Sequence, residues 1–250
     1  SQNYKNNYIE IEDFGDLTVF KKFQKKSINK KIYYKKILDL LIKIKNIKAK
    51  YQKTFLETNY KVPDYSLKKL LDESNLFLDW YLPKYVKSEK NRILKVKYNK
   101  IFKKLLNNIY YKNKVFVHRD FHISNIMITK KGLGLIDSQD AVYGNIAYDL
   151  ASLIDDVRFK TDIKTKKYIF DEFIKKNKQL NLKKFKNDFE ILSVLRNLKI
   201  IGIFTRLSVR DKKNQYLKLI PYAWDLIDYR TLNLSLIHIL TLPTISVVGV

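Results

Sequence analysis

Apolar residues recur every three or four positions through three segments of the first half of the chain, at about 28–50, 66–86 and 91–111. This spacing places apolar side chains on one face of a helix, so it predicts three amphipathic helices. Ser27 is positioned to cap the first of them. Pro83 predicts a bend near the end of the second helix, because proline cannot donate a backbone hydrogen bond.

A second pattern, short apolar runs between polar turns, begins at VFV (115–117) and continues through NIMIT (125–129) and LGLID (133–137). Such runs predict small strands. Near the start of the chain, Tyr8, Ile9 and Ile11 alternate with acidic residues and predict another short strand, which ends at the turn residue Gly15.

Helical spacing returns in the second half of the chain. It predicts further helices at about 148–157, 163–178, 182–208 and 213–231. The chain is therefore expected to be an α+β protein, mostly helical, with small strands concentrated in its middle.

Composition narrows the possible functions. The chain has 250 residues, enough for a sizeable core, and 46% of them are hydrophobic. The absence of cysteine excludes disulfide frameworks, thiolate metal sites and cysteine nucleophiles.

The net charge of +25 raises the possibility of a basic RNA-binding protein. However, the charge comes from 43 lysines spread along most of the chain, and only 7 residues are arginine. Arginine is the residue suited to bidentate recognition of phosphates and bases. Because Lys, Ile, Asn, Tyr and Phe are all encoded by A/T-rich codons, we interpret the charge as genome bias and expect no specific nucleic-acid partner.

The residues with chemical potential gather in FVHRDFHISNIMITKKGLGLIDSQD (116–140). Asp120 lies in a polar turn between two predicted strands, Asn125 follows five residues later, and Asp137 ends an apolar strand twelve residues after that. A strand–turn–strand order brings the three side chains to one edge. Each taken singly is an ordinary turn residue, but the combined spacing is far more specific.

This arrangement suits phosphoryl transfer, which needs positioning and neutralisation of phosphate charge more than covalent chemistry. Asp120 is placed to accept a hydrogen bond from an attacking hydroxyl. Asn125 and Asp137 offer the oxygen ligands that Mg²⁺ prefers.

The motif resembles the kinase-like phosphotransferases, which include aminoglycoside phosphotransferases and choline kinases. Within that group, four segments make the chain most similar to bacterial kinases that phosphorylate the anomeric hydroxyl of cell-wall amino sugars during peptidoglycan recycling. They are IEIEDFGDLT (9–18), LFLDWYLPKY (76–85), the stretch 116–156 and RNLKIIGIFTRL (196–207). The resemblance implies a kinase C-terminal lobe with small β-hairpins at the catalytic edge.

By this resemblance, Asp120 is the catalytic base, Asn125 and Asp137 are the Mg²⁺ ligands, and ATP is the phosphoryl donor. The segment of Glu12 and Asp13 resembles the hinge that meets adenine. The acceptor it implies is N-acetylmuramate or N-acetylglucosamine. An aminoglycoside or choline-type acceptor, or a catalytically incomplete binding domain, remains an alternative.

Other residues carry weaker expectations. His118 and Asp149 resemble supports of the catalytic loop, although an acid at the start of a helix also suits a capping role. Several side chains are candidates for binding the acceptor, with packing, turn or ion-pair roles as the alternatives. They are His122, Gln139, Asp140, Arg196, Lys199 and Arg206.

The resemblance also implies domain boundaries. Kinase-like phosphotransferases carry a β-rich N-terminal lobe before the hinge, yet the hinge-like strand here begins at residue 8. We therefore expect 1–24 to be a junction remnant, 25–231 the catalytic lobe, and turnover by this chain alone to be weak or absent. The tail 232–250 has no charged residue and is expected to be artefactual rather than a membrane anchor. A cytoplasmic enzyme is expected.

Overall fold

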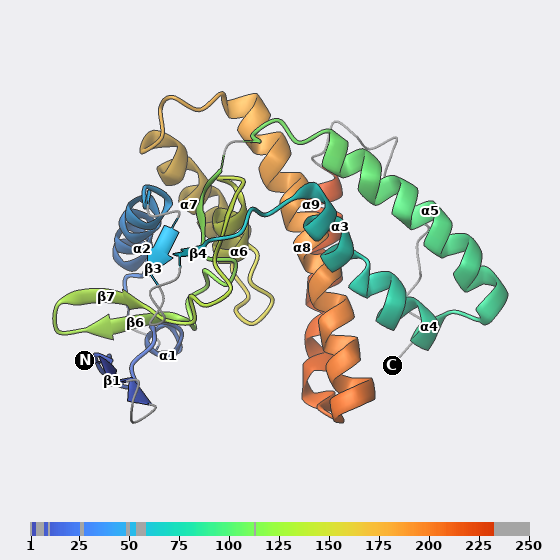
Figure 1. The fold of residues 1–250 in the computed structure, drawn as a ribbon, viewed down its shortest axis with the longest axis horizontal. Helices are drawn as coiled ribbons and strands as arrows, with labels where there is room; N and C mark the ends of the chain where they lie inside the picture. Colours follow the sequence, from blue (N-terminus) through green and yellow to red (C-terminus); the bar gives the residue numbers. More distant parts are fainter. Residues whose placement is uncertain are drawn as a thin grey trace.

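The computed structural model describes residues 2–3, 8–9, 11–25, 28–48, 51–53, 59–112 and 114–232. Its central element is the long helix α8 (Leu182–Asp211), which is buried on nearly all sides along its middle turns. Helices α9 (Ile220–Thr231) and α6 (Tyr148–Ile154) pack against it (Figure 1). A helix that is buried on nearly every side forms part of a core, and α8 organises the core of this molecule.

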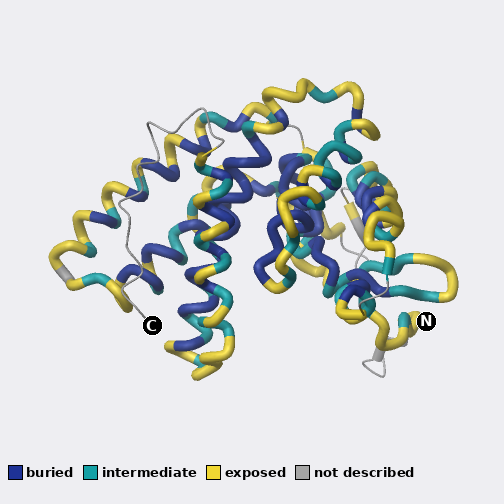
Figure 2. The backbone as a smooth tube through the Cα atoms, turned by 180° about the vertical axis from the view of Figure 1, so that it is seen from behind, coloured by how far each residue is buried: buried dark blue, intermediate teal, exposed yellow. Residues whose placement is uncertain are grey.

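The α8 helix begins at a side-chain cap, since Asn181 accepts a hydrogen bond from the backbone N–H of Lys184 at 3.0 Å. Figure 2 shows the buried backbone concentrated along α8 and the elements packed on it, with exposed residues on the outer faces. After α8, the 3₁₀ turn η3 (Asn214–Leu219) leads into α9. The predicted helix at 213–231 is therefore two elements.

The predicted helix at 66–86 is divided into three pieces. Helix α3 (Leu67–Ser74) is followed by the π-helical turn η2 (Phe77–Tyr81) and then by α4 (Leu82–Tyr85), which has Pro83 in its first turn. Helix α5 (Ser88–Asn107) matches the prediction for 91–111.

The close approach of η2 to α8 depends on Gly202. A Cβ atom at this position would lie 2.3 Å from the backbone carbon of Leu76 and 2.5 Å from its carbonyl oxygen. Those distances are too short for any side chain, so glycine lets the two backbones touch.

Three helices lie on the other side of the fold. Helix α1 (Val19–Phe23) starts at Thr18, and α2 (Lys30–Lys45) packs against α7 (Ile163–Lys175). Both α2 and α7 were predicted from apolar spacing, whereas α1 was not. The expected cap, Ser27, lies outside the described residues.

The strands within the described ranges form antiparallel pairs of two. The hairpin of β6 (Ile126–Thr129) and β7 (Gly132–Leu135) confirms two predicted strands. The predicted β5 (Val115–Val117) pairs with β8 (Val142–Gly144), which was not predicted.

Two further pairs lie earlier in the chain. Strand β1 (Gln2–Asn3) pairs with β2 (Tyr8–Ile9), and β3 (Tyr51–Lys53) pairs with β4 (Asn59–Lys61). The predicted strand at residue 8 is therefore only two residues long. Helices with small antiparallel pairs confirm the α+β prediction.

Residues 17–20 join the N-terminal side of the fold to the β6–β7 hairpin. The backbone N–H of Ile128 donates to the carbonyl of Leu17 at 2.8 Å, and the N–H of Phe20 donates to the carbonyl of Ile123 at 3.0 Å. A β-bridge between Thr18 and Met127 lies between these two bonds. The segment is thereby fixed to β6 itself and to Ile123 in the loop before it.

Among the helices that the structure describes, none is both long and apolar enough to cross a membrane.

Candidate active site

The loop between β5 and β6 carries two of the predicted site residues and is folded tightly on itself. The backbone N–H of His122 donates to the carbonyl of Asp120 at 3.0 Å, and the N–H of Asn125 donates to the carbonyl of His122 at 2.9 Å. The side-chain Nδ2 of Asn125 also donates to the carbonyl of Asp120 at 3.1 Å. These bonds fix Asp120 and Asn125 relative to each other.

Asp137 reaches the same loop from the end of β7. Its Oδ2 lies 3.4 Å from Nδ2 of Asn125, and the backbone N–H of Ile136 donates to the carbonyl of Asn125 at 3.1 Å. Asp137 adopts a left-handed backbone with φ of 70°, a conformation that aspartate tolerates better than most residues. The structure therefore brings Asp120, Asn125 and Asp137 to one edge, as the spacing predicts.

The residues at this edge fit a magnesium ion. Asn125 is half-buried and Asp137 is exposed, so both can reach a ligand from solvent. No group of three or more His, Cys, Asp or Glu side chains within the described ranges is arranged to hold a metal by itself. Mg²⁺ commonly binds one or two protein oxygens together with substrate phosphates, and this pair matches that pattern.

Asp149 supports the loop from below. The backbone N–H of His118 donates to its Oδ2 at 2.7 Å, and the N–H of Arg119 donates to its Oδ1 at 2.9 Å. Complete burial raises the pKa of Asp149 to about 7, and the two backbone donors act in the opposite direction. Asp149 lies in the first turn of α6, but Ala147 is the N-cap of that helix, so the side chain serves the loop rather than the helix end.

His118 is fully buried beside Asp149, and burial lowers the pKa of its ring. The neutral imidazole is therefore favoured, which suits a packed support of the loop rather than a proton donor.

Arg119, which precedes Asp120, has φ of 74° and ties the loop to α3. Its guanidinium forms an ion pair with Glu73 and lies 5.4 Å from the centre of the Tyr65 ring. Nη1 of Arg119 also donates to the carbonyl of Asp140 at 3.2 Å.

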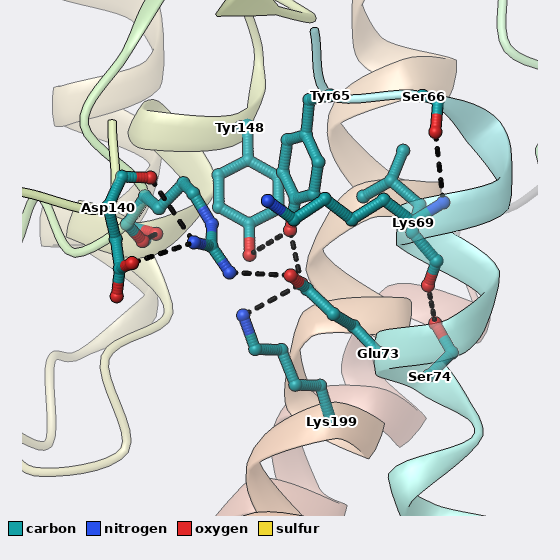
Figure 3. A network of polar contacts seen from close by, with 11 residues as sticks. Tyr65, Ser66, Lys69, Glu73, Ser74, Asp140, Tyr148 and Lys199 are labelled. Atoms are coloured by element: carbon teal, nitrogen blue, oxygen red, sulfur yellow. Dashed lines mark hydrogen bonds and ion pairs between the residues drawn. The ribbon is translucent and has the colours of Figure 1, made fainter. Parts of the chain in front are cut away.

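Glu73 is the centre of this network (Figure 3). Besides Arg119, it accepts hydrogen bonds from Tyr65 and from Lys199, whose Nζ lies 2.8 Å from Oε2. The hydroxyl of Tyr65 lies 3.1 Å from that of Tyr148. Sequence reasoning missed Glu73, and the available signal was Arg119, a cation beside Asp120 that needs a carboxylate partner.

Four of the six candidate acceptor-binding residues are paired or buried within the Glu73 network and the loop. Lys199 is paired with Glu73, and Gln139 donates to Oδ1 of Asp137 at 2.8 Å. Asp140 is exposed, with its carboxylate 3.7 Å from Arg119. His122 is 5% exposed, and burial lowers its pKa to about 4.

The two arginines on α8 differ from these four. Arg196 is 4% exposed, and within the described part of the chain it makes no hydrogen bond or ion pair. Arg206 is half-buried, and its Nε has no hydrogen-bond partner there.

The hinge-like residues lie beside the β6–β7 hairpin. Glu12 forms an exposed ion pair with Lys131 at 3.0 Å, and Oδ1 of Asp13 accepts a hydrogen bond from the N–H of Gly15 at 2.7 Å. The Phe14 ring packs against Gly134, where a Cβ would lie 2.7 Å from the ring. Contact of this segment with adenine stays a prediction.

Sequence comparison gives a family match and close relatives. The phosphotransferase enzyme family matches residues 37–174. An N-acetylmuramate/N-acetylglucosamine kinase of Neisseria meningitidis serogroup B is 35% identical over 173 residues, covering 64% of this chain and 50% of that protein. The enzyme of the same name from Pseudomonas aeruginosa is 30% identical over 166 residues, covering 64% and 49%. The chain thus spans about half the length of the curated relatives it matches.

Structural comparison agrees on the fold. The ethanolamine kinase of Plasmodium vivax superposes with a TM-score of 0.56 at 12% sequence identity. The match covers 88% of this chain and 63% of that structure. At this identity the likeness shows a shared architecture.

Proposed function

Because the chain belongs to the phosphotransferase enzyme family, we propose that it forms the catalytic lobe of an ATP-dependent kinase acting on a hydroxyl of an amino sugar. The observation that supports this most strongly is the convergence of Asp120, Asn125 and Asp137 at one edge of the fold. Phosphoryl transfer requires a base for the hydroxyl and oxygen ligands for a metal–nucleotide complex. This edge supplies both.

Asp120 acts as the base in this proposal. The backbone carbonyl of Asp120 accepts hydrogen bonds from Asn125 and His122, so the position of its backbone is fixed before an acceptor arrives. The carboxylate accepts the hydrogen bond of the acceptor hydroxyl and takes its proton as the oxygen bonds to the γ-phosphorus of ATP. The bond between that phosphorus and the β–γ bridging oxygen breaks, and ADP leaves.

Asn125 and Asp137 hold Mg²⁺, which neutralises charge on the nucleotide phosphates when it is bound. Gln139 keeps Asp137 oriented through its 2.8 Å hydrogen bond. Asp149 fixes the backbone immediately before Asp120, so a change there acts through the loop.

The proposed acceptor is supported by the relatives. They are named N-acetylmuramate/N-acetylglucosamine kinase, and the chain matches about half of their length. We propose the anomeric hydroxyl of such a sugar as the phosphorylated group. The need for ATP is the basis for expecting a cytoplasmic enzyme. The remaining proposals are that 25–231 form the catalytic lobe and that 12–13 contact adenine.

Replacing the proposed base tests this function. In the full gene product, Asp120→Asn keeps the size of the side chain and removes the proton acceptor, so kcat should fall by about 10²–10⁴-fold. Turnover is measured with labelled ATP against N-acetylmuramate, N-acetylglucosamine, an aminoglycoside and choline. The first two acceptors should be phosphorylated and the last two should not.

Asp79→Asn is the matched control, because Asp79 lies in η2 in an exposed ion pair with Lys95 and should leave kcat unchanged. Full activity of Asp120→Asn would exclude Asp120 as the base. Turnover of the aminoglycoside or choline alone would exclude the amino-sugar acceptor.

A further inference from the structure

Within the part of the chain that the structure describes, Arg196 is a buried cation without a counter-ion. Its side chain is 4% exposed, its Nη1 is fully buried, and it makes no hydrogen bond or ion pair within the described residues. Burying a charge is costly unless it is paired, and most buried charges in proteins are. The other buried arginine of the described chain, Arg230, is bonded through two nitrogens to Asp155.

The position of Arg196 connects it to the proposed active site. It projects from α8 close enough to the catalytic loop for its charge to act on His122, two residues after Asp120, and on Asp149 beneath the loop. Helix α6, which carries Asp149, packs directly on α8.

Four further polar atoms of the loop and the segment after α6 also have no hydrogen-bond partner within the described residues. They are Nδ1 of His122, Oδ2 of Asp156 and both ring nitrogens of His118. Asp156 is 3% exposed, and its other oxygen accepts hydrogen bonds from the backbone and side chain of Arg158 at 3.1 and 3.2 Å. The charges of Asp156 and Arg158 act on His122 as well. Buried polar groups that lack partners beside one catalytic loop could be satisfied by a polar ligand.

The neighbouring cation on α8 cannot serve the same purpose. Lys199 follows Arg196 by one turn, but its ammonium is engaged by Glu73 at 2.8 Å. Among the described residues, Arg196 is therefore the cation on this part of the helix that has free hydrogen-bonding capacity.

The chemistry of a guanidinium defines its ligand. Arginine binds a carboxylate with two parallel charge-assisted hydrogen bonds, which lysine cannot reproduce. The two sugars in the relatives' name differ in this respect, since N-acetylmuramate carries a carboxylate on its lactyl ether and N-acetylglucosamine has none.

We propose that Arg196 binds the carboxylate of an acidic amino-sugar acceptor and so sets the preference for acidic over neutral sugars. The proposal rests on the proposed function and identifies the specificity-determining residue of that same site. It also gives a reason for an unpaired charge in the core, because the ligand supplies the missing counter-ion.

The test compares three ligands against two proteins by titration calorimetry and turnover of the full gene product. The ligands are N-acetylmuramate, its methyl ester and N-acetylglucosamine. In the wild-type protein the ester should bind about 10- to 100-fold more weakly than the acid, since it keeps the sugar and loses the charge. Arg196→Met should weaken the binding of N-acetylmuramate by the same factor. It should change the KM of N-acetylglucosamine less than twofold.

Arg210→Met is the matched control, because Arg210 lies on the same helix and pairs with Asp211 at the surface. It should leave all three affinities unchanged. Arg196→Lys keeps the charge but loses the paired geometry. Its affinity for N-acetylmuramate should lie between those of the wild type and Arg196→Met.

The outcomes separate this proposal from the proposed function. If the wild-type protein binds acid and ester equally, the carboxylate is not recognised and the proposal is wrong, and this needs no variant to fold. If Arg196→Met weakens the binding of both sugars equally, Arg196 acts only as a support of Asp149 and the proposal is wrong. If neither sugar binds or turns over in the wild type, the proposed function fails and this inference fails with it.

Discussion

Two clusters of buried charged residues contact α8 about one turn apart, at Ser193 and at Arg196. Among the described residues, only the first cluster pairs its charges with one another. In the first, Asp155 is fully buried and bonded to Lys166 at 2.8 Å, to Arg230 at 2.8 Å and to Ser193 at 2.6 Å. Burial alone would raise the pKa of Asp155, but the adjacent Arg230 and Lys166 hold it below its ordinary value.

In the second cluster, Arg196 lies three residues after Ser193 and has charges near it but no bonded partner among the described residues. The difference separates two uses of a buried charge. A cluster that satisfies its own members joins helices together, whereas a cluster that leaves atoms unsatisfied has capacity for a ligand.

The largest effect is expected in the first cluster. Asp155→Ala would leave Lys166 and Arg230 as buried cations without their carboxylate, which typically costs about 3–5 kcal/mol. Urea unfolding should show a much lower midpoint with an unchanged m-value. Asp225→Ala, on the exposed face of α9, is the control and should stay within about 0.5 kcal/mol of wild type. Similar stability of the two variants would show that the cluster does not join the helices.

A pH titration probes the second cluster. Burial, with the nearby Arg158 and Arg196, lowers the pKa of His122 to about 4 from its ordinary 6.5, so a second cation is disfavoured there. Because the folded-state pKa lies below the unfolded one, His122 contributes stability that is complete above pH 6.5 and is lost as the pH falls toward 4. The contribution is about 3 kcal/mol.

His122→Asn removes this titration. Wild type and variant are compared by urea unfolding at pH 7 and at pH 4, and the variant should lose less stability between the two. An equal loss in both proteins would show that His122 ionises in the folded state as freely as in the unfolded chain.

The smallest effect on stability, and one of opposite direction, is expected for Arg196→Met. Methionine keeps most of the buried volume and removes an unpaired charge, so the free energy of unfolding should stay the same or rise by up to about 1 kcal/mol. Thermal unfolding without ligand measures this. A loss of 3 kcal/mol or more, like that expected for Asp155→Ala, would show that Arg196 is a structural ion and would remove the contrast between the clusters.

Local sequence predicted the loop and hairpin of the site well. Asp120, Asn125 and Asp137 lie within 18 residues of one another, and short strands with turns between them bring such residues together without help from the rest of the chain. The metal-binding and catalytic roles of these residues stay predictions. Their proximity is confirmed by the contacts between them.

Contacts between distant segments were beyond sequence reasoning. Glu73 meets Arg119 and Lys199 from positions 46 and 126 residues away, and nothing in the pattern of α3 distinguishes it from its exposed neighbour Asp72. The π-helical turn η2 was also missed, because apolar spacing does not distinguish a π-turn from an α-helix; the turn begins where the Leu76 backbone approaches Gly202.

The same limit applies to the acceptor candidates. Arg196, Lys199 and Arg206 are equivalent as charges on an apolar helix, and only their surroundings separate a paired lysine from an unpaired arginine.

The attachment of residues 17–20 to β6 has a mechanical consequence. Two backbone hydrogen bonds and a β-bridge hold this segment at Ile123, which precedes β6, and at Met127 and Ile128 within the strand. A displacement of residues 17–20 is therefore passed to β6 through backbone hydrogen bonds and not only through side-chain packing. The position of the N-terminal side is thereby coupled to the β6–β7 hairpin and, through it, to Asp137, which follows β7.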